Sequence, residues 1–203
     1  MAKKKSEFTS RNEVTVRGNV MRVYATAKIA IITIATANPT THKTDYPQIL
    51  FFDKEMIERV SQELKPGDRV TMHCVVQTRL KHRDISLLCL SYTKEMNRLD
   101  AELEGAEYLG DVNKFLIEAK VQSVYKANDK CSLMRVVVHY NGYTYFPSIV
   151  CFGNNAIKAN SAKAGDVVQV LGYIQTKLGE KDGKSTSFQS VVAQNMRTIK
   201  ATS

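Results

Sequence analysis

The sequence predicts an all-β protein built from two copies of one domain in tandem. Three segments recur in the same order about 100 residues apart: NEVTVRGNVMRVY (12–24) with NKFLIEAKVQSVY (113–125), YPQILFF (46–52) with FPSIVCF (146–152), and KPGDRVTMHCVVQTRL (65–80) with KAGDVVQVLGYIQTKL (163–178). Three blocks in constant order and nearly constant spacing are typical of a duplicated domain. Most of the recurring residues alternate in polarity or are β-branched, as in strands.

The first half of each copy is predicted to form three strands. In copy one, apolar side chains alternate along 13–24, where Gly18 is the expected site of a β-bulge. Residues 28–37 and 47–52 are β-branched or aromatic and rich in apolar residues, so each favours a strand.

A helix and two more strands complete each copy. In DKEMIERVSQELKPG (53–67) the apolar residues fall at helical spacing, with Asp53 as the expected N-cap and Pro66-Gly67 as the stop. In copy two, Asn154 or Asn155 is expected to cap a shorter helix. Residues 68–79 and 85–92 return to strand. Three strands, a helix and two strands are the order of the OB-fold, a five-stranded Greek-key barrel with its helix between strands three and four.

Charge divides the chain into three parts. Residues 1–93, the first domain, carry 15 basic and 9 acidic side chains, and residues 112–203, the second domain, carry 12 and 5. The connector, 94–111, has 2 basic and 6 acidic side chains; a short docked helix and a linker both fit it. Two basic blocks are typical of a polyanion-binding protein, although lysine chosen for solubility gives the same charge.

Several classes of function are disfavoured. The four cysteines fall singly, so neither a disulfide framework nor a metal cluster is expected, and a reducing cytoplasm fits. The lysines of MAKKKSEF precede no apolar segment, and the longest apolar run is too short to span a bilayer, so neither a signal peptide nor a membrane role is predicted. No histidine, serine or glycine motif of a catalytic or zinc site occurs, so no enzyme activity, metal or cofactor is expected.

The third strand of each copy is the candidate binding surface. Alternation places Tyr46, Gln48, Leu50 and Phe52 on one face in copy one, and Phe146, Ser148, Val150 and Phe152 on one face in copy two. Aromatic rings beside a basic groove are how proteins bind single-stranded nucleic acid. Burial in the barrel is the alternative for each ring, but a polar residue between aromatics in both copies favours partial exposure.

Further candidates are basic or tyrosine-rich. The loop between strands four and five is a common nucleic-acid clamp in OB-folds. The basic candidates are Arg79, Lys81 and Arg83 in the first hairpin, Lys177, Lys181 and Lys184 in the second, and Arg17, Arg22, Lys114 and Lys120 in the opening strands. The tyrosine candidates are Tyr140, Tyr143 and Tyr145 around an Asn-Gly turn, and Tyr173, which suggests a stronger grip by the second barrel.

These blocks resemble the bacterial single-stranded DNA-binding proteins. The resemblance covers most of both halves: an aromatic before a short apolar strand that ends in Phe, a helix, Lys-x-Gly-Asp-x-Val, and a strand ending near Gln-Thr-Arg/Lys. It implies that Tyr46 and Phe146 take the place of the family's stacking Trp, and that Phe52 and Phe152 take the place of its stacking Phe. Thr40 or Thr41 stands where the family has another aromatic. The chain ends in MRTIKATS, so recruitment through the family's acidic tip is not expected.

The function predicted is therefore binding of single-stranded DNA without marked sequence preference, in replication, recombination or DNA transfer. Since the family usually assembles four OB domains, the resemblance implies a homodimer. Two alternatives stay open: an accessory protein of a plasmid, phage or conjugative element that also binds RNA or duplex DNA, and a protein-interaction module.

Overall fold

The computed structural model describes residues 9–38, 40–81, 85–92, 97–99, 110–181 and 184–199, and the side chains of all of these except 79–99 and 178–187. The first half contains β1 (Arg11–Ala25), β2 (Ala30–Asn38), β3 (Lys43–Asp45), β4 (Gln48–Phe51), α1 (Lys54–Glu63), β5 (Arg69–Lys81), β6 (Ile85–Tyr92) and β7 (Asn97–Leu99). The second half contains β8 (Val112–Asn128), β9 (Cys131–Tyr140), β10 (Tyr143–Tyr145), β11 (Ser148–Phe152), α2 (Asn154–Ser161), β12 (Val167–Lys181) and β13 (Lys184–Ile199). The predicted all-β fold of two tandem OB barrels is confirmed.

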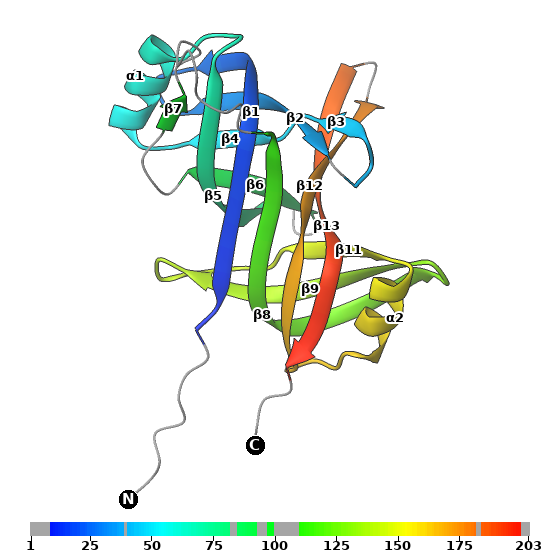
Figure 1. The fold of residues 1–203 in the computed structure, drawn as a ribbon. Coiled ribbons are helices and arrows are strands. Elements are labelled where there is room, and N and C mark those ends of the chain that lie inside the picture. Colours follow the sequence, from blue (N-terminus) through cyan, green and yellow to red (C-terminus); the bar gives the residue numbers. More distant parts are fainter. Residues whose placement is uncertain are drawn as a thin grey trace, which may run out of the picture.

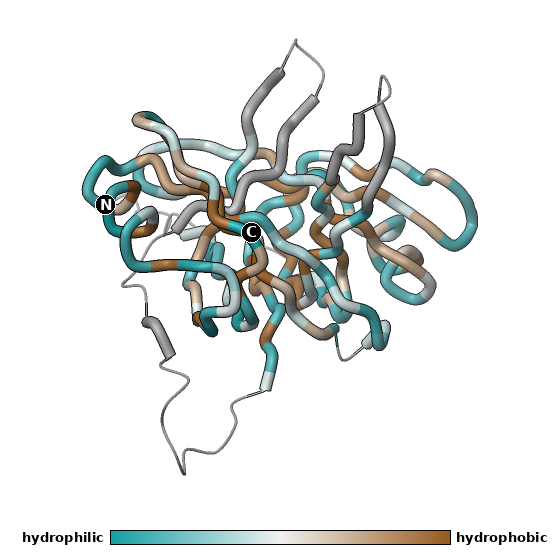
Figure 2. Tube along the Cα trace, turned by 90° about the horizontal axis from the view of Figure 1, so that it is seen from above, coloured by the Kyte–Doolittle hydropathy of each residue, from teal (hydrophilic) through white to brown (hydrophobic). Residues whose placement is uncertain are grey.

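Each barrel closes in the same way (Figure 1). In barrel 1, β1 pairs antiparallel with both β2 and β5, β2 pairs with β4, β5 pairs with β6, and a parallel β4–β6 pairing completes the circuit. In barrel 2, β8, β9, β11, β12 and β13 repeat this pattern, with a parallel β11–β13 pairing. Apolar stretches run through the strands of the interior, whereas many turns at the rim are hydrophilic (Figure 2).

The two barrels are joined by pairing between their first strands. β1 and β8 run antiparallel from Arg11 opposite Glu118 to Arg17 opposite Val112, with Val14 opposite Phe115. The repeat alignment equates Val14 with Phe115, so each of these two residues lies opposite its own counterpart. The barrels are therefore related by a pseudo-twofold axis through this pair, and a continuous sheet crosses the junction.

The residues at this axis differ in size between the copies, and the changes on the two paired strands go in opposite directions. In barrel 1, Val14 lies opposite Cys74; in barrel 2, Phe115 lies opposite Gly172. A Cβ at Gly172 would lie 2.6 Å from the Phe115 ring and 1.9 Å from the Val192 carbonyl oxygen. The Phe115 ring thus occupies the space that a side chain at residue 172 would fill, and the interior stays close-packed.

The recurring Gly-Asp pair forms the turn into the fourth barrel strand. Gly67 and Gly165 have φ of 97° and 93°, a region that favours glycine. The carboxylates of Asp68 and Asp166 accept hydrogen bonds from the backbone N–H groups three residues earlier, at 3.0 and 2.9 Å. The structural role of this repeat is therefore the same in both copies.

Local predictions are partly confirmed. Asp53 caps α1, accepting a bond from the Met56 N–H, but Gly153 rather than an asparagine is the N-cap of α2 and makes no side-chain bond. Gly18 is not the bulge, because the β1–β2 register shifts between Val20 and Arg22. Residue 18 must nevertheless be glycine, because a Cβ at this position would lie 2.0 Å from a carbonyl oxygen of β2.

Part of the connector is neither helix nor linker. Residues 97–99 form β7, which pairs antiparallel with the start of β5 and extends the sheet by one strand. The rest of 94–109 lies outside the described residues.

Candidate nucleic-acid interface

The predicted outward face of the third barrel strand is confirmed in both barrels. Tyr46 and Phe52 are 37% exposed, Phe146 is 36% exposed and Phe152 is 46% exposed. The alternate residues of β4 and β11 point into the cores, where Ile49 and its neighbours are buried. Two partly exposed rings six residues apart thus stand at the two ends of each strand, and this spacing is the same in both copies.

The bulges add a second aromatic row to each face. Beyond the bulge in β1, the inward side changes from even to odd positions, so Tyr24 points outward opposite Ile31, which in turn lies opposite Leu50. Tyr24 is 48% exposed, and Tyr125, its counterpart on β8, is 66% exposed. Sequence reasoning missed both tyrosines as candidates, although their identity in the two copies was a usable signal. Re-aiming a side chain is a common role of bulges.

Among the side chains that the structure describes, each face also carries an arginine, and the two arginines lie on different strands. In barrel 1, Arg22 on β1 lies opposite Thr33 of β2. In barrel 2, the cross-strand row runs from Ser123 to Arg135 of β9 and on to Ser148. Arg22 was a predicted candidate, whereas Arg135 was missed because no counterpart in the first copy marks it.

The basic hairpins are exchanged between the barrels. The Tyr46 N–H donates to the Thr176 hydroxyl of β12 at 3.2 Å, and the Phe146 N–H donates to the Thr78 hydroxyl of β5 at 3.0 Å. The repeat alignment equates Thr78 with Thr176, so the two contacts are pseudo-symmetric. Figure 1 shows β12 and β13 passing alongside β2 and β3. Each aromatic strand therefore lies against the hairpin of the opposite barrel.

Lys177 follows Thr176 on β12 and is exposed, and strand alternation turns its side chain to the opposite face of β12 from the Thr176 hydroxyl. The side chains of Arg79, Lys81, Lys181 and Lys184 lie outside the described part, and Arg83 lies outside it entirely, so these predictions are untested.

The structure corrects the prediction that Tyr173 contacts nucleic acid. Its side chain is only 8% exposed, so no face of the ring is free for a base. Burial, followed by the nearby Asp45 carboxylate, raises its pKa. Asp45 is itself buried and accepts hydrogen bonds from the Asn38 amide at 2.8 Å and from the Thr176 N–H at 3.1 Å. Tyr173 thus packs at the contact between the barrels. It gives no reason to expect barrel 2 to bind nucleic acid more tightly than barrel 1.

The predicted tyrosine tip is an exposed hairpin. Asn141 and Gly142 have φ of 48° and 77°, the left-handed values of a tight turn between β9 and β10. Tyr143 is 68% exposed, and its ring centroid lies 6.5 Å from that of Tyr145. Tyr140 instead lines a groove of about 320 Å³ with residues 10–15 of barrel 1.

Three predicted basic residues lie away from the aromatic faces. Arg17 donates from Nε to the Thr71 hydroxyl at 2.9 Å, and Lys114 lies opposite Thr15 across the barrel junction. Exposed Lys120 lies between β9 and β12. All three precede the bulges, so they belong to the sheet that joins the barrels.

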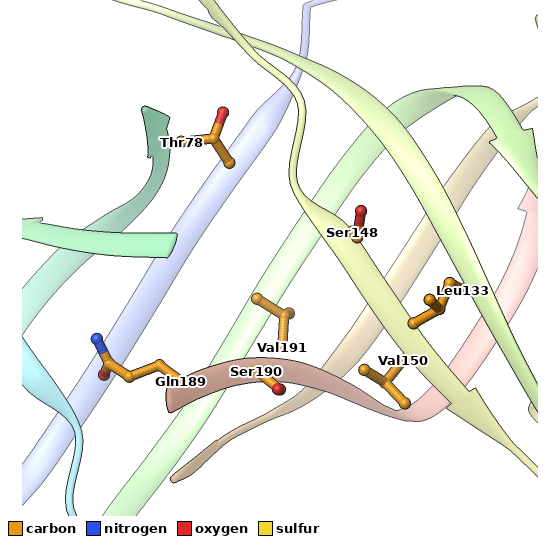
Figure 3. A pocket seen from close by; sticks show the side chains of 7 residues that line it. All are labelled: Thr78, Leu133, Ser148, Val150, Gln189, Ser190 and Val191. Atoms are coloured by element: carbon orange, nitrogen blue, oxygen red, sulfur yellow. The ribbon is translucent and has the colours of Figure 1, made fainter. Parts of the chain in front are cut away.

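A hollow of about 180 Å³ lies along β11 at Ser148 and Val150. Figure 3 shows its lining, with Thr78 of barrel 1 approaching from one side. The lining residues are Thr78, Leu133, Ser148, Val150, Gln189, Ser190 and Val191. A second hollow, of about 220 Å³, lies on barrel 1 beside Arg22 and Tyr24.

The described part of the chain offers neither a metal site nor a membrane-spanning helix. No three His, Cys, Asp or Glu side chains gather there in a metal-binding arrangement. None of its helices has the length and apolar character needed to cross a bilayer.

Neither a protein-family model nor a curated protein sequence matches the chain. Solved structures do. The single-stranded DNA-binding protein of Thermus aquaticus is 13% identical, with a TM-score of 0.67 over 97% of this chain and 96% of that one. A deletion mutant of the same protein has a TM-score of 0.65 at 12% identity, over 96% and 97% of the two chains. A Plasmodium falciparum protein complexed with single-stranded DNA aligns over 49% of this chain and all of its own, at 18% identity and a TM-score of 0.34. The full-length similarity shows the fold.

Proposed function

We propose that this protein binds single-stranded DNA, largely without sequence preference, and protects or organises it during replication, recombination or DNA transfer. The observation that carries the proposal is the pair of equivalent faces, each with two partly exposed rings that flank or end one strand. Bases stack on such rings whatever their identity, because every base has a π-face. The structural similarity to single-stranded DNA-binding proteins supports the same conclusion.

Phosphate contacts come from the basic blocks. Arg22 and Arg135 lie on the aromatic faces themselves. Each phosphate that these side chains neutralise releases condensed counterions, so log K falls with log salt at a slope of about −0.7 per phosphate on a single strand.

A salt titration tests the proposal. Binding of fluorescent oligo-dT is measured by anisotropy at several salt concentrations, with matched oligo-rU and duplex as competitors. We expect tight binding at low salt, a steep linear salt dependence and weak competition by duplex. Salt-independent binding, or none, would sink the proposal, and equal competition by duplex or RNA would favour the broader accessory role.

We also propose that two chains associate. The sheet that joins the barrels leaves Leu171 45% exposed, opposite half-buried Leu116 of β8. An apolar patch on an otherwise polar sheet favours burial against a second copy. Such a dimer would hold four OB domains.

A further inference from the structure

The asparagine that opens both copies of the repeat is buried and makes the same paired contact in each barrel. Asn12 and Asn113 are each 7% exposed. The Asn12 amide donates from Nδ2 to the Val76 carbonyl oxygen at 2.9 Å, and its Oδ1 accepts the Val76 N–H, also at 2.9 Å. Asn113 binds both backbone groups of Ile174 in this way, at 2.8 and 2.9 Å. Because the repeat alignment equates Val76 with Ile174, these paired contacts, here called asparagine clasps, are pseudo-symmetric.

Each clasp lies where the fourth strand of a barrel leaves the first strand. The β1–β5 pairing ends at Val14 opposite Cys74, and two residues further on the same register would set Asn12 opposite Val76. The side-chain amide makes the two hydrogen bonds that the backbone of residue 12 would make in a continued ladder. β5 is therefore held about one side-chain length away from β1 at this point. In barrel 2 the clasp again lies two residues beyond the last pair of β8 and β12.

A short stretch of β12 joins the clasp of barrel 2 to a contact on barrel 1. Thr176 lies two residues beyond Ile174, a rise of about 7 Å, and its hydroxyl accepts the Tyr46 N–H at 3.2 Å. Gln189, which lies opposite Thr176 on β13, binds both backbone groups of Gln48, through Oε1 at 2.8 Å and through Nε2 at 3.3 Å. The second hairpin is therefore held both where it leaves barrel 2 and where it reaches barrel 1.

The first hairpin is held in the same way where it leaves barrel 1. Thr78 lies two residues beyond Val76 on β5, and its hydroxyl accepts the Phe146 N–H of barrel 2 at 3.0 Å. Tyr46 and Phe146 carry the partly exposed rings that precede β4 and β11. A shift of either hairpin would therefore move the backbone of a candidate stacking residue on the other barrel.

We propose that Asn12 and Asn113 are positioning residues for DNA binding, and that each acts on the face of the opposite barrel. The inference rests on the proposed function. Each amide is buried in its own barrel, so it does not touch the bound strand. Its effect passes through the hairpin, from Asn113 to Tyr46 on barrel 1 and from Asn12 to Phe146 on barrel 2. An amide suits this role because it donates and accepts at once, whereas an aspartate has the same shape and only accepts.

Crossed variants test this transmission between the barrels. On an oligo-dT that covers one face only, Phe152→Ala directs the strand to barrel 1 and Phe52→Ala directs it to barrel 2. Asn113→Asp loses the donor of the clasp. It should raise Kd about threefold to tenfold in the Phe152→Ala background, as for the loss of one hydrogen bond, and less than about twofold in the Phe52→Ala background. Asn12→Asp should give the reverse pattern.

Ser132→Ala is the matched control for lost stability. It also removes a hydrogen bond of a buried side chain in barrel 2, from the Ser132 hydroxyl to the Asn160 amide oxygen at 2.8 Å, but this bond ties β9 to α2 and not to a hairpin. The control should leave both affinities unchanged. Asn113→Ser is a second, milder change at the clasp, because its hydroxyl is too short to bind both backbone groups. Thermal unfolding verifies that each variant folds.

A tryptophan on the second hairpin gives a readout that needs no DNA. The chain contains no Trp, so Phe188→Trp creates a single probe on β13, at an exposed position opposite Lys177. The fluorescence anisotropy of this probe should fall with Asn113→Asp, because the hairpin is released. It should stay unchanged with Asn12→Asp, since Asn12 holds the other hairpin.

Crossed losses of affinity, together with the fall in probe anisotropy, support the proposal. Unchanged affinities, losses of equal size on both barrels, a larger loss on the barrel that carries the variant, or unchanged probe anisotropy each overturn it while leaving strand binding intact. Failure of the unmodified protein to bind oligo-dT overturns the proposed function instead.

Discussion

Replacing Phe152 with alanine tests whether the partly exposed rings carry bases. The ring is 46% exposed at the outward end of β11, so one side is free and the other is packed. A base stacked on an aromatic side chain contributes about 1–3 kcal/mol. Losing one stack should therefore raise Kd between about 5-fold and 150-fold, because each ~1.4 kcal/mol is a factor of ten.

The pseudo-twofold axis makes the test sharper. Phe52 is the counterpart of Phe152 on the other barrel, so a strand long enough to cross both faces contacts both rings. The two rings lie on different barrels, and losses at separate, independent sites add, so the double variant should lose about 2–6 kcal/mol on such a strand. On an oligonucleotide that covers one face only, the Phe152→Ala variant should lose much less, since the short strand moves to intact barrel 1.

Fluorescence anisotropy at fixed low salt gives the affinities, and urea unfolding separates lost binding from lost packing. Ile157→Ala is the matched control, because this residue is also apolar and 66% exposed but lies on α2, away from both faces. A folded Phe152→Ala protein that binds long oligo-dT within twofold of the unmodified protein would refute the stacking argument.

The remaining predictions concern the junction, the thiols and assembly. Thr176→Val removes the acceptor of the Tyr46 N–H, so unfolding in urea should show a loss of about 0.5–1.5 kcal/mol; an unchanged free energy of unfolding would contradict the exchanged-hairpin geometry. Burial raises the pKa of Cys151 to about 12, so its thiol stays protonated at pH 8 and iodoacetamide should modify it only in unfolding concentrations of urea; rapid labelling of the native protein, detected by mass spectrometry, would show that the thiol is accessible. Light scattering should give the mass of two chains, and a monomer at micromolar concentration would exclude the dimer.

Much of the candidate site could be predicted because a strand alternates with a period of two. Once 46–52 is recognised as a strand, the outward positions of Tyr46 and Phe52 follow from the inward burial of Ile49. Tyr24 escaped this reasoning because the bulge reverses the alternation in the middle of β1. A bulge depends on how two strands pair, so local pattern alone does not locate it, and Gly18 was a misleading marker.

The exchange of hairpins was equally hidden from the sequence. Thr78 and Thr176 recur in the two copies, but the repeat contains no information about which barrel each hairpin reaches. That choice follows from the β1–β8 pairing, which sets the angle and offset between the barrels. Tyr173 was misjudged for the same reason, since a tyrosine beside a basic hairpin is buried here by the neighbouring barrel.

By itself, the sequence determined the duplicated OB-fold, the turn glycines with their aspartates, and the four partly exposed rings. These features depend on residues close together in the chain, whose periodicity and backbone preferences act locally. Tertiary structure alone decided that each aromatic strand meets the opposite barrel's hairpin, that Tyr173 is buried, and that a hollow forms between Thr78 and Ser148. Those features arise from contacts between residues about 70 to 140 positions apart, which are set by how the two barrels pack.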